Sequence, residues 1–314
     1  MRVSKNIKSA RVLITGGYGF LGHHLCTRLK DQGWKWVGRF HSAQYDFTEK
    51  KDVMTCFKQV MPDVVVHLAA KCGGIGANMA NPADFWRENL LMGVHTMEAC
   101  ADIGAKLIMV GTTCSYPKLA ELPFDEDDIF NGYPEPTNAP YGIAKRSLLV
   151  GAQAFYKQYG LKCAYLIPTN MYGEFDNFDP QTSHVIPAMI RAFHDAKKKD
   201  IKEVVLWGDG SPTRDFMYAG DCAVAIETAM IHFAAPMPIN LGTGIQTSIR
   251  SLAEMVAQIV GYKGDITWDK GKPNGQPLRA LKTELARQVL GWSAQTKLYE
   301  GIQKTYAWYL SSQG

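Results

Sequence analysis

The sequence predicts an α/β protein built on a doubly wound parallel sheet. A short apolar run at residues 11–15 is typical of a buried parallel strand, and a glycine-rich turn follows it at residues 16–22. Residues 23–30 then carry a helical pattern, so the chain begins as strand, glycine turn and helix. Further strand candidates alternate with helical segments, as the strands of such a sheet do.

Composition excludes several classes of protein. The 314 residues are 46% hydrophobic and 20% charged, which is typical of a globular chain that can bury a core. A net charge of +4 is too small to indicate nucleic acid, and no apolar run is long enough for a membrane helix. The seven cysteines are scattered and form no CxxC pair. We therefore expect no metal site, no disulfide framework and a cytoplasmic location.

The glycine turn predicts a dinucleotide-binding site. Its spacing is G-x-x-G-x-x-G, one residue different from the commoner G-x-G-x-x-G. The glycines allow a tight turn, and a pyrophosphate can then approach the N-terminus of the next helix closely. We expect the cofactor to contact Gly16, Gly19, Phe20, Leu21 and Gly22.

The end of the second predicted strand, residues 34–38, indicates which dinucleotide is bound. Sites that prefer NAD place an acidic residue there to hold the ribose 2′-hydroxyl. This chain has Arg39 instead, and a guanidinium suits a 2′-phosphate. We therefore expect NADP(H), with Asp46 beside the adenine. The alternative is that Arg39 is merely solvated.

Two further strands deliver candidate ligand contacts to the same edge of the sheet. The predicted strand at residues 63–70 ends in small residues that let a cofactor lie close, and its His67 is expected to be packed. The strand at residues 106–110 leads to Thr112, Thr113 and Cys114. The carboxyl ends of parallel strands are where such sheets bind ligands.

The remaining elements are expected from their patterns alone. They are a glycine-rich loop at residues 71–78, helices at 82–101, 183–194, 248–260, 283–290 and 299–310, a strand at 162–168, and strand-and-turn segments at 204–216 and 239–244.

Tyr141 and Lys145 lie one turn apart in a helix predicted to begin near Pro140. An ammonium near a phenol favours the phenolate, so we expect Lys145 to lower the pKa of Tyr141. Such a tyrosine can exchange a proton with a carbonyl or alcohol oxygen. Taken alone, the pair is more often an ordinary exposed pair on a helix surface.

The order of glycine turn, hydroxyl-bearing fourth strand and Tyr-x-x-x-Lys resembles the extended short-chain dehydrogenase/reductase superfamily. Within it, the chain is similar to the epimerase/reductases that convert GDP-4-keto-6-deoxy-D-mannose into GDP-L-fucose. The similar stretches begin at His67, Cys114, Glu135, Pro168 and His184.

This resemblance implies the organisation of the whole chain. It implies a Rossmann-type dinucleotide-binding domain over residues 8–168 and 216–247. A smaller discontinuous α/β domain over residues 169–215 and 248–314 would bind the nucleotide sugar. It also implies a homodimer with a GDP-sugar substrate and with neither nucleic acid nor membrane as a partner.

The resemblance also implies roles for individual residues. Thr112 matches the catalytic serine position, Tyr141 the proton donor and Lys145 its partner. Cys114 matches the epimerisation base, and His184 matches the epimerisation acid. Further cofactor contacts would come from Leu68, Ala69, Ala70, Tyr141, Lys145, Pro168 and His184. Substrate contacts would come from Thr113, Asn170, Val185, Trp207, Arg214 and Arg279.

Two departures from the family leave alternatives open. Thr112 and Thr113 replace two serines, and a threonine hydroxyl makes the same hydrogen bond. Arg279 replaces a basic pair, so one contact to the nucleotide is lost. A GDP-4-keto-heptose, epimerisation at C5 only, a simple 4-ketoreductase and an inactive dinucleotide-binding regulator therefore remain as alternatives. Alone, Cys114 could be a small buried hydrophobe and His184 a helix-start histidine.

Overall fold

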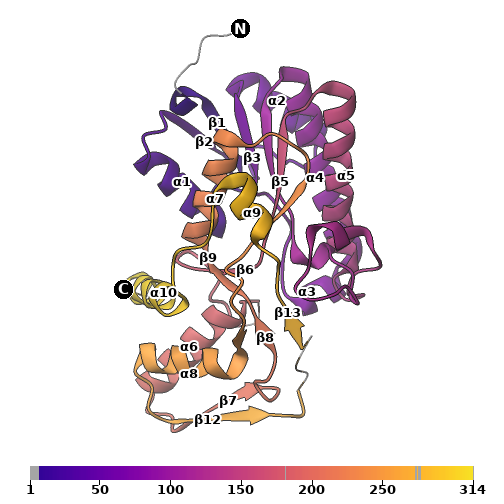
Figure 1. The fold of residues 1–314 in the computed structure, drawn as a ribbon. Coiled ribbons are helices and arrows are strands. Elements are labelled where there is room, and N and C mark those ends of the chain that lie inside the picture. The colour runs from indigo at the N-terminus through magenta and orange to yellow at the C-terminus, as the bar shows by residue number, and fades with distance from the viewer. Residues whose placement is uncertain (1–6, 181, 273, 275–276, 314) are drawn as a thin grey trace.

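A six-stranded parallel sheet forms the larger part of the molecule (Figure 1). The computed structural model describes residues 7–180, 182–272, 274 and 277–313. The strand order is β10-β5-β4-β3-β1-β2, and every pairing is parallel. The strands are β1 (Arg11–Thr15), β2 (Trp36–Arg39), β3 (Val64–His67), β4 (Lys106–Val110), β5 (Cys163–Pro168) and β10 (Pro238–Leu241). The predicted doubly wound α/β fold is confirmed.

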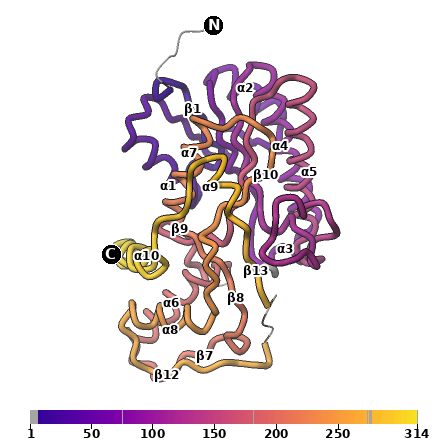
Figure 2. Tube along the Cα trace, in the orientation of Figure 1, coloured from indigo at the N-terminus to yellow at the C-terminus, as the bar shows by residue number. Residues whose placement is uncertain are grey.

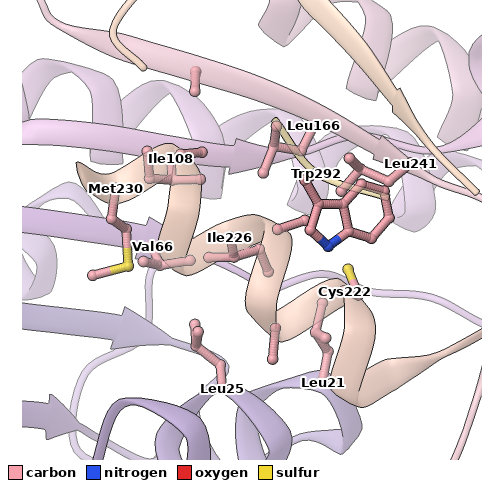
Figure 3. Close-up of a cluster of buried hydrophobic side chains, with 14 of the residues drawn as sticks. Leu21, Leu25, Val66, Ile108, Leu166, Cys222, Ile226, Met230, Leu241 and Trp292 are labelled. Carbon is pink, nitrogen blue, oxygen red and sulfur yellow. The ribbon is translucent and has the colours of Figure 1, made fainter. Parts of the chain in front are cut away.

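Helices cover both faces of this sheet because its strands are apolar on both sides. Val12 and Ile14 of β1 join one buried cluster, and Leu13 between them joins the other. The first cluster is packed by α1 (Phe20–Asp31), α7 (Ala219–His232) and α9 (Glu284–Leu290). The second is packed by α2 (Lys50–Val60), α4 (Pro82–Ile103) and α5 (Ala139–Tyr159). Figure 3 shows the first cluster, where Ile226 of α7 faces Val66 of β3.

The smaller part has a third core of its own. It is built by α6 (Val185–Lys198), α8 (Ile249–Val260) and α10 (Leu298–Ser312) with β7 (Glu203–Trp207) and β12 (Asp265–Asp269). The other short strands are β6 (Asn170–Tyr172), β8 (Thr213–Arg214), β9 (Phe216–Tyr218), β11 (Thr247–Ser248) and β13 (Leu278–Arg279). Figure 2 shows that three stretches far apart in the chain come together here.

The glycine-rich segment after β3 is predicted to be a loop, but part of it is helical. It forms α3 (Ile75–Ala80), so the prediction is wrong from its fifth residue onward. The side-chain amide of Asn78 donates to the carbonyls of Gly73 and Gly74, at 2.9 and 3.1 Å. These bonds hold a turn that the glycine content disfavours.

Short 3₁₀ helices are also present, and the bounds of one predicted helix differ in the structure. The 3₁₀ helices are η1 (Ile7–Ser9), η2 (Thr113–Ser115) and η3 (Glu126–Phe130). The helix predicted at 183–194 begins after His184, which is its N-cap, and it continues to Lys198. Within the described ranges, no helix combines the length and the apolar character needed to cross a membrane.

Candidate functional site

A cleft of about 1910 Å³ lies at the carboxyl edge of the large sheet. The loops after β1, β3, β4 and β5 line one side, and residues of the smaller part line the other. Every residue assigned to the site from the sequence lines this cleft except Arg39. The structure therefore brings together side chains that are far apart in the chain, at the edge where parallel α/β sheets bind ligands.

The loop between β1 and α1 leaves room for a pyrophosphate. Gly16 has a φ of +67°, and a Cβ there would lie 2.8 Å from the amide nitrogen of Ala69. A Cβ at Gly22 would overlap the carbonyl oxygen of Gly16. Gly19 caps α1 without a side chain, so the first amides of that helix are available to an anion. These glycines fit the close approach of a dinucleotide.

Arg39 lies beside the cleft and not on its wall. Its guanidinium carbon lies 4.2 Å from the ring centroid of Tyr18, and its Nη1 donates to the carbonyl of Gly17 at 3.3 Å. Tyr18, His41 and Asp46 line the cleft at this place. Asp46 accepts two hydrogen bonds from its own loop. The assignment of Arg39 to a 2′-phosphate stays a prediction.

Thr112, Cys114 and Tyr141 meet where η2 packs on α5. The Thr112 hydroxyl oxygen accepts the amide of Cys114 at 3.2 Å and so caps η2. It is also hydrogen-bonded with Tyr141. Ser115 donates to the carbonyl of Gly142 at 3.0 Å, and a Cβ at Gly142 would overlap the carbonyl oxygen of Cys114. The close contact fixes the side chains of Thr112, Cys114 and Tyr141 relative to one another.

Burial controls the protonation of Tyr141 and Lys145. It raises the pKa of Tyr141 well above its ordinary value, and the thiols of Cys72 and Cys114 add to that effect. The hydrogen bond with Thr112 lowers this pKa but does not reverse the shift. Burial also lowers the pKa of Lys145 to about 8. The expectation that the pKa of Tyr141 lies below its ordinary value is therefore wrong in this structure, because burial favours the neutral phenol.

One of two paired arginines lies next to the thiol of Cys114. β8 and β13 pair in parallel, with Arg214 opposite Arg279. The Nη1 of Arg279 donates to the sulfur of Cys114 at 3.8 Å. Burial, and then the charge of Arg279, lower the pKa of Arg214 to about 10. Two like charges held this close suit a diphosphate, which would lie beside the thiol.

His184 faces the cleft from the smaller part. Its side chain makes no capping hydrogen bond with α6, although it occupies the N-cap position, and it lines the cleft. Val185, Trp207 and Asn170 line the same cavity. Trp207 is 69% exposed, so a face of its ring is available to a planar base.

Several lining residues were not assigned from the sequence. They include Tyr18, His41, Ser42 and Cys72. The sequence could have indicated the first three, because Tyr18 lies inside the glycine turn and His41 and Ser42 lie two and three residues after Arg39. No local pattern indicates Cys72, since its approach to Tyr141 and Lys145 depends on folding.

Two other expectations concern the burial of His67 and the presence of a metal site. His67 is buried as predicted, and its Nδ1 lies 2.9 Å from the hydroxyl of Thr15. Among the described residues, no three or more His, Cys, Asp and Glu side chains are grouped so that they could hold a metal ion.

Sheet order, glycine loop and the Tyr141–Lys145 pair define a dinucleotide-dependent enzyme of the extended short-chain dehydrogenase/reductase type. The family model for the NAD dependent epimerase/dehydratase family matches residues 12–242, and the chain belongs to this family. The resemblance found in the sequence is thereby confirmed.

Individual relatives match over almost the whole chain. Probable GDP-L-fucose synthase 1 of Oryza sativa subsp. japonica is 39% identical over 307 residues, covering 97% of this chain and 93% of that protein. GDP-L-fucose synthase of Escherichia coli strain K12 is 37% identical over 314 residues, covering 96% and 97%. A solved structure of MlghC, a GDP-mannoheptose C4 reductase from Campylobacter jejuni with NADP bound, superimposes with a TM-score of 0.88. It is 28% identical and covers 96% of this chain and 99% of that one.

Proposed function

We propose that this protein epimerises and reduces a GDP-4-keto-6-deoxy sugar with NADPH, giving GDP-L-fucose. The observation that carries the proposal is the meeting of Cys114, His184 and Tyr141 on one cleft, beside a pair of arginines. The rice and Escherichia coli relatives, both named as GDP-L-fucose synthases, support the same sugar because they match along almost their full length.

The cofactor is NADP(H). The glycine loop fits a pyrophosphate, and β2 ends in Arg39 where an NAD site would carry an acid. The NADP-bound Campylobacter jejuni reductase supports this choice. The cofactor supplies the hydride that reduces C4 of the sugar, and the protein positions and polarises the two partners.

In the epimerisation step, a ketone at C4 makes the hydrogens at C3 and C5 acidic. Removal of either proton leaves an enolate whose charge lies on the C4 oxygen. Thr112 and Tyr141, which meet at one point of the cleft, would donate hydrogen bonds to that oxygen. The thiolate of Cys114 would remove the proton from one face. His184 would return a proton to the opposite face and so invert the carbon.

In the reduction step, Tyr141 gives its proton to the C4 oxygen. Its raised pKa keeps this proton in place at neutral pH, as a donor requires. Lys145 is charged below its pKa of about 8, so at neutral pH it can stabilise the phenolate that remains after the transfer.

The second candidate is a 4-ketoreductase or epimerase/reductase that acts on a related GDP-sugar, including a heptose. The observation that favours it is the similarity to the GDP-mannoheptose C4 reductase. A GDP-sugar that is epimerised only at C5 belongs to the same group. The combination of Thr112, Tyr141 and Lys145 in one cleft argues against an inactive dinucleotide-binding regulator.

Product analysis tests these assignments. The protein is incubated with GDP-4-keto-6-deoxy-D-mannose and NADPH, and the product is identified by NMR. We expect GDP-L-fucose, inverted at C3 and C5. A product that keeps the D-configuration would establish a simple 4-ketoreductase. Absence of NADPH oxidation with either this sugar or the corresponding heptose would refute an enzymatic role.

We further propose that the protein acts as a homodimer in the cytoplasm. α4 and α5 pack side by side on one face of the sheet and expose Trp86 and Val150, which suit pairing with a second copy. All seven cysteines are free, as is usual in a reducing compartment. Val150→Glu should turn dimers into monomers in analytical ultracentrifugation, and localisation of a tagged protein tests the compartment.

A further inference from the structure

We propose that Asp176 is a positioning residue for His184 in the epimerisation step. Its carboxylate lies behind the wall of the cleft and favours the charged, proton-bearing imidazole that inversion of a ring carbon requires. The carboxylate itself does not touch the sugar. The inference rests on the proposed epimerisation, but it does not depend on which GDP-sugar is epimerised.

Asp176 and His184 lie near the two ends of the segment that joins β6 to α6. The side-chain amide of Asn177 donates to the hydroxyl of Thr182 at 2.8 Å, so the segment closes on itself. Asp179 accepts the amide and the hydroxyl of Thr182, at 3.1 and 2.9 Å. The chain neighbours of Asp176 and of His184 are thus bonded to one another, which brings the two side chains to the same place.

Contacts with the smaller part hold this segment before a sugar binds. The ring of Phe178 stacks on Tyr309 of α10, with centroids 4.7 Å apart. The Nη1 of Arg191, in α6, donates to the carbonyl of Phe178 at 3.0 Å. His184 is the N-cap of the same helix. The carboxylate and the imidazole are therefore preorganised relative to one another.

The carboxylate of Asp176 is buried, and only one of its oxygens is satisfied. The residue is 8% exposed, and its Oδ1 accepts the backbone amide of Asn177 at 2.7 Å. Its Oδ2 is buried and has no hydrogen-bond partner among the described residues. Burial of an ionised carboxylate is unfavourable unless donors or an opposite charge compensate it. Such a group behind the wall of a cleft indicates a role beyond support of the chain.

The opposite charge that faces Asp176 is that of His184. Burial raises the pKa of Asp176, whereas the amide of Asn177 and then the charge of His184 lower it. Attraction between two charges is mutual, so a carboxylate that the imidazolium stabilises also stabilises the imidazolium. The Oδ2 atom is not hydrogen-bonded to the imidazole in this structure, so the effect passes through charge.

This effect suits the acid of an epimerisation. After Cys114 has removed a proton from the sugar, the imidazolium of His184 gives its proton to the opposite face of the enolate carbon. The C4 ketone is restored, and a neutral imidazole remains. A free imidazole is mostly neutral at pH 7 and then has no proton to give. A nearby carboxylate increases the fraction of the protein that can complete the inversion.

Removal of the charge without a change of shape tests the proposal. Asp176→Asn keeps the volume of the side chain and an acceptor for the amide of Asn177. The variant is incubated with GDP-4-keto-6-deoxy-D-mannose and NADPH in D₂O, and NMR measures deuterium at C3 and C5 and the configuration of the product. Exchange and NADPH oxidation should continue, because Cys114 and Tyr141 are unchanged. We expect the ratio of inversion to exchange to fall roughly tenfold, the lower end for loss of a carboxylate that supports a functional histidine.

Two further variants separate charge from support of the chain. Asp176→Ala also removes the acceptor for Asn177, and it should lower the ratio as Asp176→Asn does. If Asp176→Asn keeps the normal ratio and only Asp176→Ala loses it, the carboxylate is structural and the proposal is wrong. Asp179→Asn is the matched control, because Asp179 is exposed, lies in the same segment and does not line the cleft. Its ratio should not change, and a fall equal to that of Asp176→Asn would also overturn the proposal.

Cys72 is the other group that the charge of Asp176 affects. Burial raises the pKa of the Cys72 thiol, Lys145 lowers it, and Asp176 raises it. An unchanged ratio in Cys72→Ala would support a direct effect of Asp176 on His184. If Cys72→Ala lowers the ratio as far as Asp176→Asn does, Asp176 acts through the thiol, and the proposal is wrong. If the unmodified protein shows neither exchange nor inversion, the proposed epimerisation itself is refuted, and the role of Asp176 is refuted with it.

Discussion

Burial raises the pKa of Tyr141 further above its ordinary value, and this phenol, which is protonated at neutral pH, is the proposed proton donor. Loss of that proton donor should slow the reduction of C4. We expect Tyr141→Phe to lower the turnover number roughly 10²- to 10⁴-fold, the range for general acid catalysis. NADPH oxidation with the 4-keto sugar measures the loss, and circular dichroism checks the fold. Near-normal reduction by this variant would remove Tyr141 from the mechanism.

Lys145 should set an alkaline limit for the same reaction. Its pKa is lowered to about 8 by burial, and its Nζ donates to the carbonyl of Val110 at 3.2 Å. A lysine is charged below its pKa and neutral above it, so the ammonium that stabilises the phenolate is lost as the pH rises through about 8. We expect the turnover number for reduction to fall above that pH. Lys145→Met should reduce slowly at every pH, and its turnover number should not fall as the pH rises through about 8. If the turnover number of this variant falls as it does in the unmodified protein, the assignment is wrong.

Which residues line the cleft could be predicted from the sequence, but their electrostatics could not. The glycine turn and the Tyr141–Lys145 spacing are local signals that read directly from the sequence. The pKa of Tyr141 depends instead on burial by distant segments, including Cys72 from the loop after β3. The interaction of Arg279 with Cys114 joins residues 165 positions apart, so no local pattern indicates it.

At the scale of elements, the contact between α5 and η2 holds the reactive groups in place. Gly142 permits this contact, because a Cβ there would overlap the carbonyl oxygen of Cys114. Gly142→Ala should force η2 away from α5 and lower the free energy of unfolding by about 1–3 kcal/mol, as overpacking does. Activity should fall further than stability explains, since Thr112 and Cys114 move with η2. Denaturant unfolding and NADPH oxidation measure the two effects.

Gly151 provides the matched control for this substitution. It lies in the same helix, and a Cβ there would meet only the flexible end of Met97, at 2.8 Å. Alanine also favours a helix over glycine by about 1 kcal/mol, so Gly151→Ala should leave stability and activity nearly unchanged. Equal losses in both variants would show that α5 responds to any added methyl group.

The pairing of β8 with β13 should determine the affinity for the nucleotide. It places Arg214 opposite Arg279, where both guanidinium groups can reach a diphosphate. We expect Arg214→Ala to weaken the binding of free GDP at least about tenfold, since charge-assisted hydrogen bonds are lost. Arg250→Ala is the control, because Arg250 lies over Trp268 and does not line the cleft. Calorimetry with GDP measures both variants, and an unchanged affinity of Arg214→Ala would exclude the diphosphate contact.

Helix α3 shows why some elements escape prediction. Its segment is rich in glycine, which disfavours a helix, so the sequence predicts a loop. The bonds from Asn78 and the packing of α3 against α4 override that preference. By contrast, β1 appears with its predicted boundaries, because a fully buried parallel strand has a continuous apolar pattern of its own.

At the scale of the whole molecule, the smaller part depends on contacts between distant segments. The buried carboxylate of Asp215 accepts bonds from Thr243 and Gly244, and Gly301 packs under the ring of Tyr172. Such contacts join segments that are far apart in the chain, and no local sequence pattern predicts them. The domain boundaries at 168, 215 and 247 therefore stay a prediction. Limited proteolysis at those positions tests them.

The two halves of the proposed reaction draw on the molecule differently. Cys114 lies in η2, just after β4 in the larger part, and His184 is the N-cap of α6 in the smaller part. Inversion of a ring carbon needs both residues, one on each side of the sugar. Reduction needs Tyr141, which lies in the larger part with the glycine loop. The two steps should therefore separate by mutation.

Cys114→Ser replaces an ionisable thiol with a hydroxyl that scarcely ionises near neutral pH. We expect the variant to lose solvent deuterium exchange at C3 and C5, measured by NMR. It should still oxidise NADPH and reduce the unepimerised ketone to a GDP-6-deoxy-D-hexose. His184→Asn should retain exchange, because the base still removes protons, but should invert poorly. If Cys114→Ser forms the inverted sugar at the normal rate, Cys114 serves only packing. Proton removal would then require another base in the cleft, and Cys72 is the other thiol that lies close enough to influence Tyr141.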